Sequence, residues 1–251
     1  MQAGIHAICV QRFSRRIARV FRQTSISATG LLWPRQEMGV IFMQSRSIDM
    51  IHQEIRDRIC TGYYTTGQTL YETSLGREFE VSRTPIRQVL QRLALEQMAV
   101  TRTGVGTMVV EASHADCARA LAVKARMLGI VLDLNLLAND RDFAVDLSIA
   151  RRLLDMTSSQ SAPDTLYRAF QGVHALSNGL INDELLRMTD GMLFYRVAPR
   201  LVRGAAKRPD EAAAFLAGML AQAGEGRPED RMTFLRAAAD AGHATARLLD
   251  H

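Results

Sequence analysis

Apolar residues recur at helical spacing over most of the chain, so the pattern predicts a mainly α-helical protein. The first clear stripe lies in residues 47–59, where four isoleucines fall on one helical face: Ile48, Ile51, Ile55 and Ile59. Ser47 is a suitable N-cap for this helix. A short second helix is expected at residues 71–79, after the glycine-punctuated stretch "CTGYYTTGQTL".

The stretch "VSRTPIRQVLQRL", residues 81–93, combines an apolar stripe with a basic face and contains no acid. Ser82 and Pro85 suit the start of a helix. The spacing i, i+3, i+4, i+7 predicts a buried stripe made of Ile86, Val89, Leu90 and Leu93. The other residues are expected on the surface, among them Arg83, Thr84, Arg87, Gln88 and Gln91.

Residues 99–112 have the pattern of a β-hairpin. Val100–Arg102 and Thr107–Val110 are strand-like, and the tip between them is Thr103-Gly104-Val105-Gly106. From Ala112 onward no alternating pattern persists, and breaks in the apolar periodicity predict about six helices. The expected fold class is therefore mainly α, with a small β-hairpin in the N-terminal half and an all-α bundle in the C-terminal half.

The basic charge of the chain is concentrated at its N-terminus. Residues 1–36 hold six arginines and no acid, which leaves 25 basic against 26 acidic residues elsewhere. Three interpretations of this segment stay open: a transit-type peptide, a basic arm that contacts phosphates, and an early start codon before Met43 or Met50. We expect residues 1–42 to be a weakly ordered extension without an essential role.

Other sequence features limit the class of protein. No apolar run reaches the length of a membrane span, and Cys9, Cys60 and Cys117 show neither a disulfide framework nor a metal-binding spacing. A cytoplasmic protein is expected. A nucleophile elbow, a Walker loop and a dinucleotide glycine motif are all missing from the sequence, so an enzyme is not expected.

The order of helix, short helix, tight break, helix and hairpin is that of a winged helix-turn-helix, in which the last helix enters the DNA major groove. Arg83 and Arg87 are four residues apart, so both side chains project from one face. Arginine can pair bidentately with guanine. Ser82 and Thr84 can donate hydrogen bonds to phosphate. A small-residue wing tip can approach the DNA backbone or minor groove without a clash.

Residues 62–110, "GYYTTGQTLYETSLGREFEVSRTPIRQVLQRLALEQMAVTRTGVGTMVV", resemble the DNA-binding domain of GntR-type bacterial transcription regulators. The resemblance implies a repressor that binds double-stranded DNA as a homodimer on a two-fold symmetric operator. It implies base or phosphate contacts for Ser82, Arg83, Thr84 and Arg87 and wing contacts for Thr103, Gly104 and Gly106. The domain is expected to span residues 43–112. Two positions depart from the family pattern: Thr66 replaces a frequent proline and Gln88 a frequent glutamate.

The helical half, residues 113–251, resembles the helical (FCD) effector domains of this family, with a helix count closer to the VanR-like subgroup. The resemblance implies a dimerisation domain that senses a small organic acid. Arg126, Arg196 and Arg200 are candidate anion partners, and His174 is a candidate effector contact. Arg196 and Arg200 can share a helical face, although Pro199 is expected to end or kink that helix.

Regulators of this helical branch often hold a divalent metal through one aspartate and three histidines, with the aspartate four residues before the first histidine. Here Phe170 lies four residues before His174, and Met232 stands where a later histidine is expected. Neither side chain supplies the oxygen or imidazole donor that such ions prefer. We therefore expect no metal and no cofactor. The alternative to a sensing domain is a helical half that serves only oligomerisation.

Overall fold

The computed structural model describes residues 35–138, 142–157 and 162–249, and side chains from Ile48 onward except that of His243. The chain separates into two compact units, residues 1–44 and residues 45–251. Within the first unit the structure describes only residues 35–44, which are helical. All contacts reported below lie within the second unit. No helix among the described residues is long and apolar enough to cross a membrane.

The N-terminal part of the second unit contains the elements that the sequence predicts for a winged helix, plus one short strand. In chain order the elements are α2 (Arg35–Cys60), of which residues 45–60 belong to this unit, β1 (Thr69–Leu70), α3 (Glu72–Glu78), α4 (Arg83–Leu95), β2 (Ala99–Arg102) and β3 (Gly106–Val109). The predicted short helix, the helix with the basic face and the hairpin are thus confirmed as structural elements. The predicted start at Ser47 is wrong, because α2 already begins at Arg35 and Ser47 lies inside it.

A three-stranded antiparallel sheet forms the wing, with the strand order β1-β3-β2. Thr107 of β3 lies opposite Thr101 of β2 and opposite Leu70 of β1. The hydroxyls of Thr101 and Thr107 are 3.1 Å apart and form a hydrogen bond across the hairpin. The two-residue strand β1 thereby ties the chain before α3 to the wing.

The helical half contains seven helices among the described residues. They are α5 (His114–Asp133), α6 (Phe143–Asp155), α7 (Pro163–Gly179), α8 (Glu184–Lys207), α9 (Pro209–Ala221), α10 (Asp230–Asp240) and α11 (Gly242–Arg247). The predicted count of about six was one short, because a break at Ala241 separates α10 from α11. Pro199 was predicted to end or kink its helix, and it does not end it: α8 continues to Lys207.

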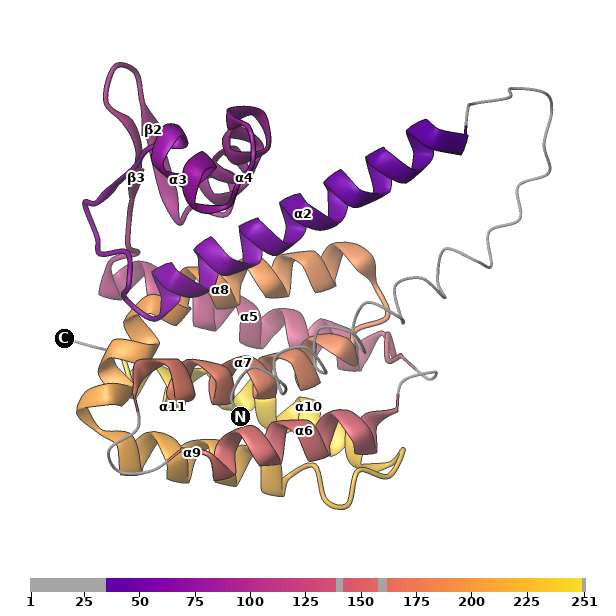
Figure 1. The fold of residues 1–251 in the computed structure, drawn as a ribbon. Coiled ribbons are helices and arrows are strands. Elements are labelled where there is room, and N and C mark those ends of the chain that lie inside the picture. The colour runs from indigo at the N-terminus through magenta and orange to yellow at the C-terminus, as the bar shows by residue number, and fades with distance from the viewer. Residues whose placement is uncertain (1–34, 139–141, 158–161, 250–251) are drawn as a thin grey trace. The chain divides into compact units, whose positions relative to one another are not determined.

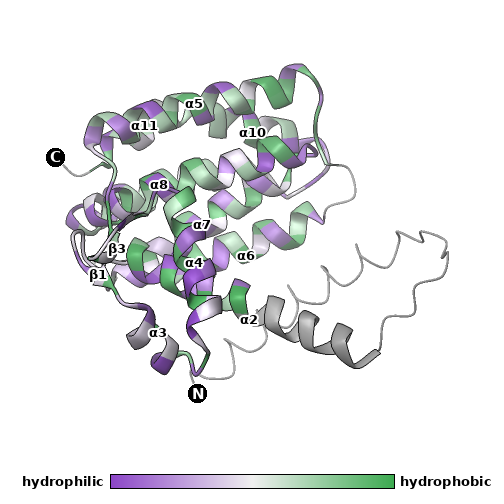
Figure 2. Ribbon diagram, turned by 90° about the horizontal axis from the view of Figure 1, so that it is seen from above, coloured by the Kyte–Doolittle hydropathy of each residue, from purple (hydrophilic) through white to green (hydrophobic). Residues whose placement is uncertain are grey.

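Helices α5, α7 and α8 lie side by side in this half (Figure 1). Helix α6 packs on α7, α9 packs on α6 and α7, and both α10 and α11 pack on α5. Apolar and polar residues alternate around the turns of these helices (Figure 2). Each helix therefore turns one face inward, as an amphipathic pattern requires.

Two clusters of buried apolar residues stabilise the second unit. The cluster centred on the winged helix includes Ile55, Leu90 and Leu93 and continues into α7 through Leu166. The other lies between α5, α6, α7, α9 and α10, where the rings of Phe143 and Phe234 are 6.0 Å apart. Because the first cluster is shared, α2 is anchored on both the winged helix and the helical half.

Candidate functional site

Helix α4 presents the basic face that the sequence predicts. The stripe of Ile86, Val89, Leu90 and Leu93 is at most 2% exposed, which fixes the rotation of the helix. Arg83, Thr84 and Arg87 are consequently exposed at its N-terminal end. The predicted buried and exposed faces are both confirmed.

Ser82 is the N-cap residue of α4, as predicted, with extended backbone angles. Its side chain makes no capping hydrogen bond and is exposed. The hydroxyl can therefore donate to an external acceptor, beside backbone N–H groups that a helix start leaves unpaired. This end of α4 is suited to a phosphate group.

Glu72 of α3 places an acid on the basic face, which the local sequence did not indicate. Arg87 donates from Nε to Oε1 of Glu72 and from Nη2 to Oε2, both at 2.9 Å. Hydrogen bonding from Arg87 lowers the pKa of Glu72, so the carboxylate is ionised at neutral pH. The pair is solvent-exposed, with 62% of the Arg87 side chain accessible. Water screens an exposed pair of this kind, so the pair contributes little to stability; it orients Arg87 and can exchange for a ligand.

The wing tip lies at the predicted position, between β2 and β3. Gly104 has φ +77° and Gly106 has φ +114°, values that residues with side chains rarely adopt. Thr103 is exposed beside them. Arg102 at the end of β2 is also exposed, and sequence reasoning missed it because it belongs to the strand pattern. The tip thus combines a small-residue turn with one cation.

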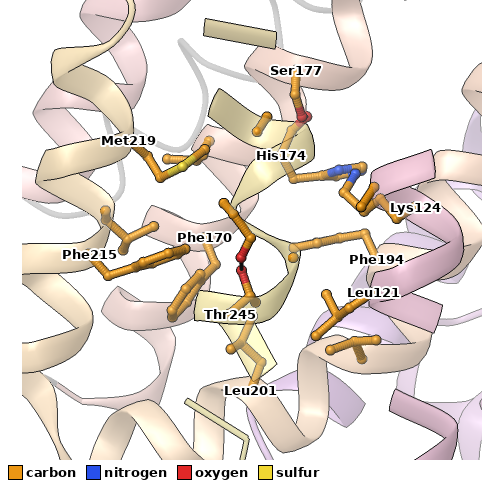
Figure 3. Close-up of a pocket in the computed structure, with 17 residues that line it drawn as sticks. Leu121, Lys124, Phe170, His174, Ser177, Phe194, Leu201, Phe215, Met219 and Thr245 are labelled. Carbon is orange, nitrogen blue, oxygen red and sulfur yellow. Dashed lines mark hydrogen bonds between the residues drawn. The ribbon is translucent and has the colours of Figure 1, made fainter. Parts of the chain in front are cut away.

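A cavity of about 80 Å³ lies inside the helical half. Helices α5, α7, α8, α9, α10 and α11 all contribute to its wall (Figure 3). The wall is mainly apolar, with Leu121, Phe170, Phe194, Phe215 and Met219 among its residues. Its polar side chains are those of Lys124, His174, Ser177 and Thr245.

Of the four predicted effector residues, only His174 lines this cavity. Arg196 and Arg200 do share a face, but it is turned toward the first turn of α5 and the segment before it. Arg196 lies 4.0 Å from Asp116, and Arg200 donates to the carbonyl of Ala112 at 3.2 Å. Arg126 is exposed on α5 and is not part of the cavity wall. The three arginines therefore do not converge on a common site.

A buried polar cluster borders the cavity, and sequence reasoning found only one of its four members, His174. The Asp190 carboxylate is fully buried and is bonded by the ammonium of Lys124. Asn178 donates to the other carboxylate oxygen of Asp190 at 3.0 Å. Nδ1 of His174 lies 3.3 Å from that same oxygen, without hydrogen-bond geometry. Figure 3 shows the His174 ring and the Lys124 ammonium turned toward each other.

The charges in this cluster follow from burial and from its internal contacts. Burial, together with the nearby Lys124 ammonium, lowers the pKa of His174 to about 3. Burial alone would raise the pKa of Asp190, but Lys124, His174 and Asn178 together hold it below its ordinary value. At neutral pH the cluster thus contains an ionised Lys124–Asp190 pair and a neutral imidazole. The ring of His174 is stacked on Phe194 with centroids 4.0 Å apart.

The residues around His174 do not fit the metal that the family resemblance implies. The described residues contain no group of three His, Cys, Asp or Glu side chains that could hold a metal ion. The carboxylate of Asp190, which lies near His174, is occupied by an ammonium that a divalent cation would have to displace. Phe170, four residues before His174, lines the cavity with an aromatic ring. No role of this site is therefore assigned to a metal.

Comparison with known proteins supports the winged helix. The model of "Bacterial regulatory proteins, gntR family" matches residues 47–109. The gluconate operon transcriptional repressor of Bacillus licheniformis is 32% identical over 103 residues, 41% of this chain and 41% of that protein. The match thus spans about two fifths of the curated relative.

Two solved structures share the fold over most of the chain. McbR/YncC from E. coli has a TM-score of 0.60 at 14% identity, covering 80% of this chain and 97% of the other. A GntR transcriptional regulator from Rhodococcus sp. RHA1 has a TM-score of 0.57 at 14% identity, covering 81% and 97%. The Bacillus licheniformis protein is named as a transcriptional repressor and the Rhodococcus protein as a transcriptional regulator. Residues 47–109 therefore form a winged helix that matches the GntR family, and the helical domain after it has the fold seen in these two structures.

Proposed function

We propose that this chain is a sequence-specific DNA-binding transcription repressor of the bacterial cytoplasm, with α4 as its recognition helix. The observation that carries the proposal is the exposed N-terminal end of α4, where Arg83, Thr84 and Arg87 stand clear of a fully buried apolar stripe. The wing tip at Thr103, Gly104 and Gly106 would contact the adjacent backbone. In this arrangement side chains of α4 read base edges, while phosphate contacts set the orientation.

Selection of bound DNA from a random pool tests this proposal and identifies an operator. Arg83→Ala and Arg87→Ala should each reduce discrimination between operator and random DNA by about 1–3 kcal/mol, because a bidentate base contact is lost. Arg77→Ala, which removes an exposed arginine of α3, is the matched control and should keep that discrimination. Parent-like specificity in both α4 variants would exclude α4 as the reading helix.

We also propose that the helical half forms a homodimer, so that two winged helices meet a two-fold symmetric operator. Helix α5 exposes Val123, Ile130 and Leu134, and the adjacent α8 exposes Leu185, Met188 and Met192. Clustered exposed apolar residues mark association surfaces. Leu134→Glu should raise the monomer fraction in analytical ultracentrifugation, whereas Met232→Glu on α10, also exposed, should not. A purely monomeric parent, with and without operator, would contradict the proposal.

The cavity in the helical half supports effector sensing as the finer part of the proposed function. Its wall reaches the helix that precedes the DNA-binding elements: the Tyr195 ring contacts His174, and Arg56 of α2 lies 3.5 Å from the centroid of the same ring. A ligand that prefers one geometry of these helices would change operator affinity by linkage. If the helical half serves oligomerisation only, filling the cavity would leave operator affinity unchanged.

A further inference from the structure

We infer that the cavity of the helical half selects a small uncharged molecule, mainly apolar and carrying one hydrogen-bond acceptor, rather than a carboxylate. This inference rests on the proposed sensing function and replaces the small organic acid that the family resemblance implies. It follows from the size of the cavity, the composition of its wall and the pairing of its one cation.

The size of the cavity limits the ligand. Sites for drug-sized molecules measure roughly 300–1,000 Å³, whereas this cavity measures about 80 Å³. Phe170, Phe194 and Phe215 form much of its wall, and Phe194 is held in place by its stack on His174. A ligand of about five non-hydrogen atoms fits such a space without rearrangement, since a single water needs roughly 10–15 Å³.

The charge balance of the wall excludes an anion. Among the described residues that line the cavity, Lys124 has the one cationic side chain, and its ammonium is paired with the buried carboxylate of Asp190. His174, the other titratable group of the wall, is neutral at physiological pH. A ligand carboxylate would lose its hydration and would be repelled by the Asp190 carboxylate, which is bonded to the same ammonium. Burying a charge without a free counter-charge is strongly unfavourable.

A neutral ligand with a hydrogen-bond acceptor, by contrast, is compatible with the Lys124–Asp190 pair. An ammonium has three N–H donors, and the described contacts of Lys124 engage it with Asp190. A ketone, ester or ether oxygen can accept a hydrogen bond from another of its N–H groups without disturbing the pair. The hydroxyls of Ser177 and Thr245 already donate to backbone carbonyls of His174 and Ala241. Lys124 is therefore the donor that would orient the ligand, and the apolar wall would cover the rest.

The chain offers a direct spectroscopic test, because it contains only two lysines, Lys124 and Lys207. Protein labelled with 13C at the lysine ε-carbon gives one signal at the cavity and one at the exposed Lys207, which serves as an internal control. The probes are butanone and propanoate, which have the same number of non-hydrogen atoms and differ in charge. Molecules this small bind weakly, so both titrations extend into the millimolar range.

We expect butanone to shift the Lys124 signal alone and to bind at least about tenfold more tightly than propanoate at neutral pH. Asp190→Asn removes the counter-charge and should narrow or reverse this ratio by strengthening propanoate binding. Should that variant not fold, the parent protein supplies the second measurement. Lowering the pH from about 7.5 to about 5.5 converts more propanoate into the neutral acid and should strengthen its apparent binding. Butanone binding should stay constant, since His174, with a pKa of about 3, remains neutral.

Tighter binding of propanoate than of butanone at neutral pH, seen at the Lys124 signal, would overturn the neutral-ligand inference and leave a sensing cavity in place. Absence of any Lys124 shift with either probe would overturn the inference together with the effector role of the cavity. Neither result affects the proposal of DNA binding, which depends on α4 and is measured on operator DNA.

Discussion

Replacing Lys124 with methionine should strongly destabilise the helical half. The change keeps the aliphatic stem and removes the ammonium that bonds to Asp190. The Asp190 side chain is 0% exposed and that of Lys124 is 18% exposed, so the orphaned carboxylate cannot reach water. Removing one partner of a buried ion pair costs about 3–5 kcal/mol. We expect a loss of that size in the free energy of unfolding at neutral pH.

The loss of stability in this variant, called its deficit below, should depend on pH. In the parent, the pKa of Asp190 lies below its ordinary value of 3.8, so Asp190 stabilises the fold above that pH. Without the ammonium, burial raises its pKa in the folded state, and the folded variant binds a proton that the unfolded chain releases. The deficit therefore grows as pH rises above about 4 and shrinks toward acid. Proton uptake by His174, 3.3 Å from the carboxylate, would act in the same direction.

Urea unfolding of the parent and the variant at about pH 5 and about pH 8 measures this difference. Lys207→Met is the matched control, since the Lys207 side chain is exposed, and it should change stability little. The double variant Lys124→Met/Asp190→Asn removes the orphaned charge and should be more stable than Lys124→Met alone. The reasoning would be contradicted if Lys124→Met lowered the free energy of unfolding by less than about 1 kcal/mol, or if its loss of stability grew toward acid pH. Either result would show that Lys124 does not neutralise a buried Asp190 carboxylate.

Three further variants test other parts of the structure. Leu93→Ala should cost about 2–5 kcal/mol in urea unfolding because it opens a cavity in the winged helix, whereas Leu95→Ala, at a position 76% exposed, should cost little. Glu72→Gln removes the carboxylate that holds Arg87 in a bidentate pair. Because Arg87 then loses its orientation, the variant should discriminate less between operator and random DNA in competition binding. Unchanged discrimination would show that the pair is only a surface contact. In the parent, the free energy of unfolding should fall as pH drops below 6.5, because the unfolded chain binds a proton on His174 there and the folded chain does not. His174→Gln should make this fall less steep. If the pH dependence is unchanged, a residue other than His174 takes up that proton.

The sequence predicts the winged helix well because local patterns specify its main elements. The stripe of Ile86, Val89, Leu90 and Leu93 fixes α4 by itself, and glycines mark the wing tip. Strand β1 was missed because it has only two residues and its partners in β3 lie far along the chain. The break at Ala241 was missed because the alanine-rich sequence around it continues the helical pattern.

The cavity was harder to predict, for a physical reason. Lys124, His174 and Asp190 belong to α5, α7 and α8, and only the packing of these helices brings them together. The sequence indicated arginines as partners of an anionic ligand instead. In the structure, however, Arg196 faces Asp116, and Arg200 and Arg203 face Glu111. The pairing of Arg87 with Glu72 was hidden in the same way. Sequence periodicity indicates which face of a helix is polar, but not which charge lies opposite.

The contacts between the cavity and the DNA-binding elements form a continuous series. Tyr195 contacts His174 on one side and Arg56 of α2 on the other. The next residue of α2, Asp57, accepts a hydrogen bond from Tyr167 of α7 at 2.6 Å. Earlier in α2, His52 pairs with Glu96, the C-cap residue of α4, at 3.0 Å. A shift of α8 against α7 therefore acts on the helix that supports α4.

The energy available to drive such a shift is set by the ligand. A ligand moves a conformational equilibrium only by the difference between its affinities for the two states. The best small ligands gain about 1.5 kcal/mol per non-hydrogen atom, so a molecule of about five such atoms, which fits about 80 Å³, gains at most about 7 kcal/mol on binding. Allosteric coupling typically needs about 1–3 kcal/mol, a large share of that total. A cavity of this size can control operator affinity only if one state of the protein closes it almost completely, and the aromatic wall formed by Phe170, Phe194 and Phe215 is the part able to do so.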